Sequence, residues 1–113
     1  MNLNGNEQSY LQEKIGLARA AFTQGDETKA LAYLQEARIT LTSCAAVEIA
    51  VAHVFEDFGN LILARAYFQE ALYKEPDNAE AQICLELVEL QLAGKSLRVV
   101  RPTEQPTLFE EYS

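Results

Sequence analysis

An eight-residue segment occurs twice in this chain, and the spacing of its copies constrains the fold more than any other feature. The segment ALAYLQEA at residues 30–37 returns as ARAYFQEA at residues 64–71, with six of eight letters identical and an offset of 34 residues. The same offset relates Gly25 to Gly59. A fixed period of this size is typical of arrays in which small structural units stack on one another.

Glycines and short polar residues divide the chain into pieces of helix length. Gly25, Gly59 and Gly94 each follow a run with helical apolar periodicity, as a left-handed C-cap does. Residues suited to helix N-caps precede the later runs: Asp26, Ser43, Asn60 and Asp77, the last in a capping-box spacing with Glu80. The predicted helices span residues 8–24, 27–41, 44–58, 61–74 and 78–93. Connections this short make neighbouring helices antiparallel.

The repeated positions resemble those of the tetratricopeptide repeat family. The residues that carry the resemblance are Leu17, Ala18, Gly25, Ala30, Leu34 and Ala37 in the first copy, and Val51, Ala52, Gly59, Ala64, Phe68, Ala71 and Pro76 in the second. The resemblance covers residues 11–94. It implies an all-α fold, a short right-handed α-solenoid of antiparallel helical hairpins, with repeats at 11–44 and 45–78 and a capping helix at 78–93.

The alanines of the repeat have a physical reason to recur at the same places. Small side chains let two helices approach closely where they cross, and Leu34 or Phe68 then fills the neighbouring gap. A bulky residue at Ala30 or Ala64 should overpack this crossing and cost about 1–3 kcal/mol. The third repeat stops after one helix, and Glu86 stands there at the position of Ala18 and Ala52.

The C-terminal part of the chain has a different composition. The expected helical domain covers residues 1–94, and residues 95–113 are expected to form an extended tail containing two prolines. Large apolar side chains occur among acidic residues near its end: Leu108, Phe109 and Tyr112. We expect these three to dock on an apolar surface of this copy or of a neighbouring one; a solvated end is the alternative.

The charge of the chain limits the kinds of partner it can bind, and its apolar segments indicate where it is located. With 9 Lys and Arg against 17 Asp and Glu, the net charge is −8, which disfavours binding to nucleic-acid phosphates and suits a basic protein segment. The N-terminus does not resemble a secretory signal, and no segment approaches the ~20 apolar residues that span a bilayer. The chain is expected to be cytoplasmic, without membrane contact.

In the resembled family, the first helices of successive repeats line a concave groove that binds a peptide or a helix. The positions carried over to this sequence are Ile15, Arg19, Phe22, Ile49, His53, Glu56, Ile83, Leu87 and Leu90. Helical periodicity alone places Ile15, Ile49, Ile83 and Leu87 equally well in the core. The family's Lys, Asn and Arg set for a C-terminal carboxylate is replaced here by Ile15, Arg19 and His53, so apolar anchoring is the expected mode.

Residues for catalysis or metal binding do not form a recognisable motif. His53 is the only histidine and has no partner in a metal-ligand spacing, and Cys44 and Cys84 are expected to be reduced, buried thiols. There is no Gly-rich phosphate loop and no nucleophile motif. We therefore expect no enzyme activity, no cofactor and no metal.

Two functions remain. The first is a non-catalytic adaptor or scaffold that binds a peptide or helix of a partner protein in the groove. The alternative is an assembly module that forms a homodimer, or a larger homo-oligomer, through the apolar fifth helix and the tail. Light scattering distinguishes the two, because only assembly predicts a stable oligomer.

Overall fold

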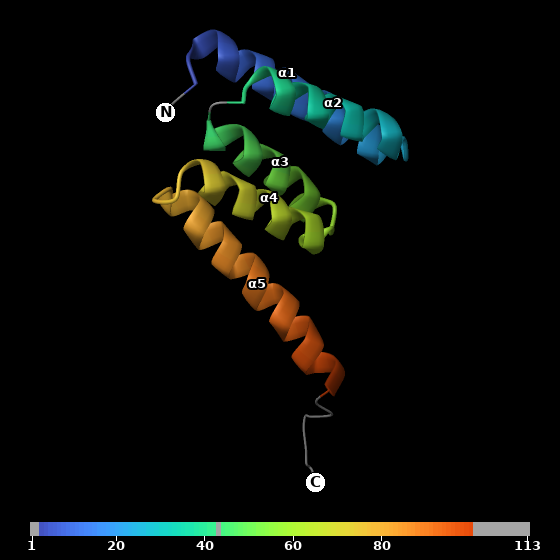
Figure 1. The fold of residues 1–113 in the computed structure, drawn as a ribbon. Coiled ribbons are helices and arrows are strands. Elements are labelled where there is room, and N and C mark those ends of the chain that lie inside the picture. Colours follow the sequence, from blue (N-terminus) through green and yellow to red (C-terminus); the bar gives the residue numbers. More distant parts are fainter. Residues whose placement is uncertain (1–2, 43, 101–113) are drawn as a thin grey trace, which may run out of the picture.

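The structure is a computed structural model that describes residues 3–42 and 44–100, with the backbone alone for residues 95–100. These residues form five helices: α1 (Gly5–Thr23), α2 (Glu27–Thr40), α3 (Ala45–Asp57), α4 (Leu61–Lys74) and α5 (Ala79–Val100). The fold is all-α, as predicted. The helices pack as consecutive antiparallel pairs, α1 with α2, α3 with α4, and α4 with α5 (Figure 1).

The turns inside the first two hairpins have the same local geometry, 34 residues apart. Gly25 and Gly59 have φ angles of 83° and 85°, the left-handed region that favours glycine. Asp26 and Asn60 follow them as N-caps, and each side chain accepts a hydrogen bond of 3.1 Å from the backbone N–H three residues later. The 34-residue period thus repeats the same turn, in which a glycine ends one helix and the following Asp or Asn caps the next.

The alanines of the repeat lie in the helix crossings, where the sequence predicted them. Six of them are 0% exposed: Ala18, Ala30, Ala37, Ala52, Ala64 and Ala71. Leu34 and Phe68 fill the adjacent space and are also buried. The core therefore lies between the two helices of each hairpin. The helices can approach this closely because the side chains at the crossing are no larger than a methyl group.

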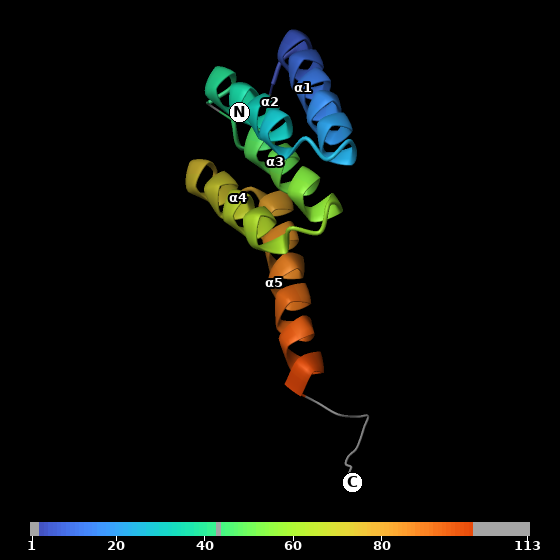
Figure 2. The same ribbon diagram turned by 90° about the vertical axis from the view of Figure 1, so that its right-hand side faces the viewer.

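The third helix holds the fold together across the hairpins. α3 contacts both α1 and α2 as well as its own partner α4. In the view of Figure 2, α1 and α3 lie on the right and α2 and α4 on the left, with α5 extending below them. α5 packs on α4 through buried Ala81 and Val88, and it meets α3 at His53. One face of the molecule is therefore built from α1, α3 and the first turns of α5.

The fifth helix is longer than predicted and begins one residue later. It runs through Gly94 to Val100, so Gly94 is not the predicted C-cap and residues 95–100 are helical. A glycine inside a helix costs only about 1 kcal/mol, and no proline follows it until Pro102. The N-cap is Asn78 rather than Asp77, because the Asn78 side chain accepts from the Ala81 N–H at 2.9 Å. The predicted capping box with Glu80 is therefore absent.

Two other helix starts also differ from the prediction. α1 begins at Gly5 rather than residue 8, because Asn4 and Glu7 form a capping box in which each side chain accepts from the backbone N–H of the other. α3 begins at Ala45, with Cys44 as its N-cap; the sulfur accepts from the Ala46 N–H at 3.4 Å. The predicted cap Ser43 lies outside the described residues.

Candidate functional site

An open pocket of about 320 Å³ lies on the face of α1, α3 and α5 and is called here the α1–α3 pocket. Its lining comes from three helices and the turn before α5: Gln8, Leu11, Gln12, Cys44, Ala46, Ile49, Ala50, His53, Glu75, Asn78 and Glu80. Leu11 and Ile49 are buried and form an apolar floor, whereas Glu75 and Glu80 bring carboxylates to the rim. The pocket thus combines a small apolar floor with a largely polar surround of glutamine, asparagine, histidine and glutamate side chains.

The structure separates the groove residues predicted on α1 and α3 into different roles. Ile49 and His53 line the α1–α3 pocket, although Ile49 is itself buried. Ile15 belongs to the core. Arg19 forms an ion pair of 2.6 Å with Asp57 of α3, and Phe22 packs against the aromatic rings of α3 and its C-terminal turn. Of these five residues, Ile49 and His53 line the pocket, and the other three do not.

The predicted groove residues on α5 form a separate apolar surface, called here the α5 stripe. Ile83, Leu87 and Leu90 are 58%, 53% and 63% exposed, and none of them lines the pocket. A helix turns about 100° per residue, so the stripe lies largely opposite the α4-facing side, where Ala81 and Val88 are buried. The predicted docking residues of the tail, Leu108, Phe109 and Tyr112, lie outside the described residues.

Glu75 connects the pocket rim to the start of α3. Its Oε2 accepts from the Ala45 N–H at 3.1 Å, and its Oε1 accepts from the Asn78 side-chain amide at 3.1 Å. These hydrogen bonds, first that from Asn78 and then that from Ala45, lower the pKa of the Glu75 carboxyl below its ordinary value. Because the free N–H groups at a helix N-terminus favour negative charge, Glu75 stays ionised beside the pocket.

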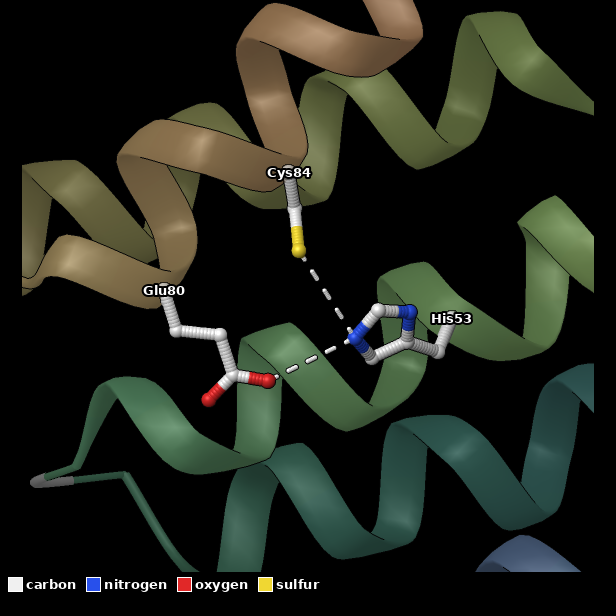
Figure 3. A group of neighbouring side chains, drawn as sticks. All are labelled: His53, Glu80 and Cys84. Carbon is white, nitrogen blue, oxygen red and sulfur yellow. Dashed lines mark hydrogen bonds and ion pairs between the residues drawn. The ribbon is translucent and has the colours of Figure 1, made fainter.

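A histidine, a glutamate and a cysteine meet where α5 crosses α3, a group called here the His53 cluster (Figure 3). The His53 Nε2 lies 3.6 Å from the Glu80 Oε2 and 4.0 Å from the Cys84 Sγ. One ligand atom from each of the three residues lies within 4.8 Å of the others. Glu80 and Cys84 are four residues apart on α5, one helical turn, so both side chains leave the helix on the same side.

The surroundings of the His53 cluster fix the ring and set the state of the thiol. The Glu56 Oε1 lies 3.1 Å from the His53 Nδ1, and the ring packs edge-on to Phe68 at 5.3 Å between centroids. Burial, with added repulsion from the Glu80 and Glu56 carboxylates, raises the pKa of the Cys84 thiol. A nucleophilic cysteine needs a lowered pKa, so this arrangement does not resemble a catalytic Cys–His pair.

Glu48 is a buried carboxylate that the sequence reasoning missed. It is 1% exposed in the first turn of α3, and it accepts from the Arg38 Nε at 2.9 Å and the Lys74 Nζ at 2.7 Å. Arg38 also lies over the Tyr67 ring at 4.8 Å. A glutamate inside the apolar run AAVEIAVAHVF was the available signal, together with a basic residue in the last turn of each adjoining helix. Glu48 thereby connects α3 to the last turns of α2 and α4.

Comparisons with known proteins yield no relative: no family model, curated protein or solved structure matches this chain. The resemblance to tetratricopeptide repeats stays a prediction that rests on the residues and the period of the chain. Along residues 3–42 and 44–100, no helix is both long and apolar enough to cross a bilayer. The function must be inferred from the α1–α3 pocket, the α5 stripe and the charges around them.

Proposed function

We propose that this chain is a short right-handed α-solenoid of the tetratricopeptide type and acts as a non-catalytic adaptor or scaffold. It binds an extended or helical segment of a partner protein on the face of α1, α3 and α5. The observation that carries the proposal is the α1–α3 pocket, an open hollow of about 320 Å³ with a buried apolar floor. Such a pocket accepts one or two apolar side chains of a bound segment as anchors.

The charges around the pocket favour a basic segment. Glu75 and Glu80 lie on its rim, and Glu75 stays ionised because of its hydrogen bonds. No lysine or arginine is among the residues that line the pocket. The whole chain carries a net charge of −8, which adds a long-range attraction for cations. The expected ligand is a peptide with an apolar anchor flanked by Lys or Arg.

A selection from a library of displayed random peptides tests this function. The enriched peptides should combine an apolar residue with basic neighbours and bind the purified chain with one-to-one stoichiometry. Gln12→Lys, on an exposed position of the pocket rim, should weaken their binding about tenfold, because it adds a cation next to the anchor. Gln69→Lys, on an exposed position of α4, is the matched control and should bind normally. Peptides without a basic preference, or equal losses in both variants, would contradict the proposal.

A second function, homo-oligomeric assembly, is favoured by the α5 stripe. Its three large apolar side chains are more than half exposed, and an uncovered apolar helix face is unusual in a chain that stays monomeric. Light scattering over a range of concentrations tests this function. A dimer that Ile83→Glu with Leu87→Glu dissociates, and that Ile39→Glu with Ile62→Glu leaves intact, would establish assembly. A monomer at every concentration would rule assembly out and leave the adaptor.

A further inference from the structure

The geometry of the His53 cluster points to a metal site: we infer that His53, Glu80 and Cys84 bind one Zn²⁺ ion between α3 and α5. The three side chains offer a nitrogen, an oxygen and a sulfur, and these ligand atoms lie within 4.8 Å of one another. Imidazole, carboxylate and thiolate are the ligands that zinc takes in proteins, whereas calcium and magnesium require oxygen ligands. The mixed donor set therefore favours zinc over calcium and magnesium.

Two of the three ligand distances are close to those of a tetrahedral ion, and the Glu80 and Cys84 ligand atoms, within 4.8 Å of each other, would close on the metal. Zinc bonds of about 2.0–2.3 Å at tetrahedral angles place ligand atoms about 3.4–3.6 Å apart. The observed 3.6 Å between the His53 Nε2 and the Glu80 Oε2 already has this value, and the 4.0 Å to the Cys84 Sγ exceeds it by a few tenths of an ångström. Side-chain rotation of Glu80 and Cys84, both on the same side of α5, supplies the remaining movement (Figure 3).

The residues around the cluster prepare the histidine for coordination. A carboxylate only accepts hydrogen bonds, so the 3.1 Å contact with Glu56 places the proton of a neutral ring on Nδ1 and leaves the Nε2 lone pair free. This lone pair faces Glu80 and Cys84. A carboxylate on the second nitrogen of a metal-binding histidine is a common supporting contact that fixes the ring and strengthens the ligand. Across the described part of the chain, no lysine or arginine pairs with Glu56 or Glu80.

Binding has a simple chemical balance. Zn²⁺ replaces the proton of the Cys84 thiol, and any proton on the His53 Nε2, and these protons pass to solvent, while the Glu80 carboxylate binds without further change. The resulting centre of one dication, one thiolate and one carboxylate is neutral overall. The fourth position faces outward, because Glu80 is exposed and both His53 and Glu80 reach the pocket rim. A water molecule occupies this position unless a bound segment supplies a ligand.

The site would fasten α5, a terminal helix whose main packing partner is α4. α5 is held mainly by α4, and Glu80 and Cys84 of α5 meet α3 at His53. A metal bond from α3 to two side chains of α5 would fix the angle between these helices. Zinc should therefore raise the melting temperature of the chain, because an ion that binds only the folded state stabilises it.

Titration of the reduced full-length chain with Co²⁺, followed by Zn²⁺, tests the site. The expected result is one Co²⁺ per chain, with the visible absorption of a tetrahedral ion and a thiolate-to-cobalt charge-transfer band, both removed by one equivalent of Zn²⁺. Cys84→Ser should abolish the charge-transfer band, and His53→Ala should weaken binding at least a hundredfold. Glu56→Gln, which keeps all three ligands, should weaken binding about ten- to a hundredfold.

Matched controls separate this site from unspecific binding. Cys44→Ser removes the other thiol while leaving a side chain that can cap α3, and Glu89→Gln removes an exposed carboxylate of α5; both should bind Co²⁺ like the parent chain. Circular dichroism checks that each variant is helical. Absence of the tetrahedral spectrum in the parent chain would overturn the inference, as would a band that survives Cys84→Ser. One metal ion per two chains, with metal-dependent dimerisation, would place the site between copies and also contradict it.

Discussion

The carboxylate of Glu48 on α3 lies 2.7 Å from the ammonium of Lys74 on α4, at a place where Glu48 is only 1% exposed. Arg38 of α2 contacts the other oxygen of the same carboxylate. One buried charge is thus shared by two cations from different hairpins, and both cations keep part of their surface in solvent. The carboxylate is therefore shielded from solvent, whereas its two cationic partners remain partly hydrated.

Removing the cations of this network should destabilise the chain more than removing the carboxylate. Arg38→Met with Lys74→Met leaves the buried Glu48 carboxyl without these two partners, which should lower the free energy of unfolding by about 3–5 kcal/mol. Glu48→Gln leaves two cations that can turn toward water and should cost about 2 kcal/mol. Urea denaturation at pH 7 measures both changes. The reverse order would show that the carboxylate is hydrated in solution.

The close helix crossings predict a strong dependence on side-chain size at one position of α4 and none at its neighbour. Ala64 is fully buried in α4, which packs on α3 and α5, so Ala64→Leu should lower the stability by about 1–3 kcal/mol through overpacking. Ala66 lies on the exposed side of the same helix, and Ala66→Leu should change it by less than about 0.5 kcal/mol. Thermal unfolding followed by circular dichroism compares them. Equal melting temperatures of the Ala64→Leu and Ala66→Leu variants would contradict a close helix crossing at Ala64.

Three glycines should respond to alanine with opposite signs. Gly59 has a φ of 85°, so Gly59→Ala should destabilise the chain by about 1–2 kcal/mol. Gly16 and Gly94 are helical and have open space at the Cβ position, so alanine there should stabilise by about 0.5–1 kcal/mol. The Gly94 variant decides where α5 ends, because a loss of stability would restore the C-cap predicted from the sequence. Chemical denaturation of the three single variants gives the signs.

The hydrogen bonds of Glu75 predict a stability difference that depends on pH. The pKa of this carboxyl is lowered in the folded chain, so its contribution is present above the ordinary value of 4.5 and disappears as the pH falls through the lowered pKa. Glu75→Gln should therefore cost about 0.5–1 kcal/mol at pH 7, a range reduced for solvent screening, and almost nothing in strong acid. Glu70→Gln, at an exposed position of α4, is the matched control. Urea titrations at several pH values make the comparison.

The parts of the fold that were predictable depend on neighbours in the sequence. Helix positions follow from apolar periodicity, and the turns at Gly25 and Gly59 follow from residues that tolerate a positive φ. The six alanines were predictable because the 34-residue period repeats the same crossing twice. The end of α5 was not, because a single glycine is a weak stop signal and only the balance of helix propensities over the following residues decides it.

The candidate site was predictable only in part, because it depends on angles between helices that are distant in sequence. The family resemblance pointed to Ile49 and His53, which line the α1–α3 pocket, but it could not show that Ile15 is covered while Leu87 is exposed. His53 and Cys84 are 31 residues apart, and no ligand spacing in the sequence joins them. Glu48 was missed for the same reason, since its partners come from two other helices.

The contacts between the first two hairpins also determine how the chain unfolds. Arg19 of α1 pairs with Asp57 near the C-terminus of α3, and Arg38 of α2 pairs with Glu48 near its N-terminus. Both ends of α3 therefore form ion pairs with the first hairpin. Neither hairpin can move relative to the other, or unfold alone, without breaking one of these ion pairs. The two repeats should lose their structure in a single cooperative transition, as one folding unit rather than as two that happen to be adjacent.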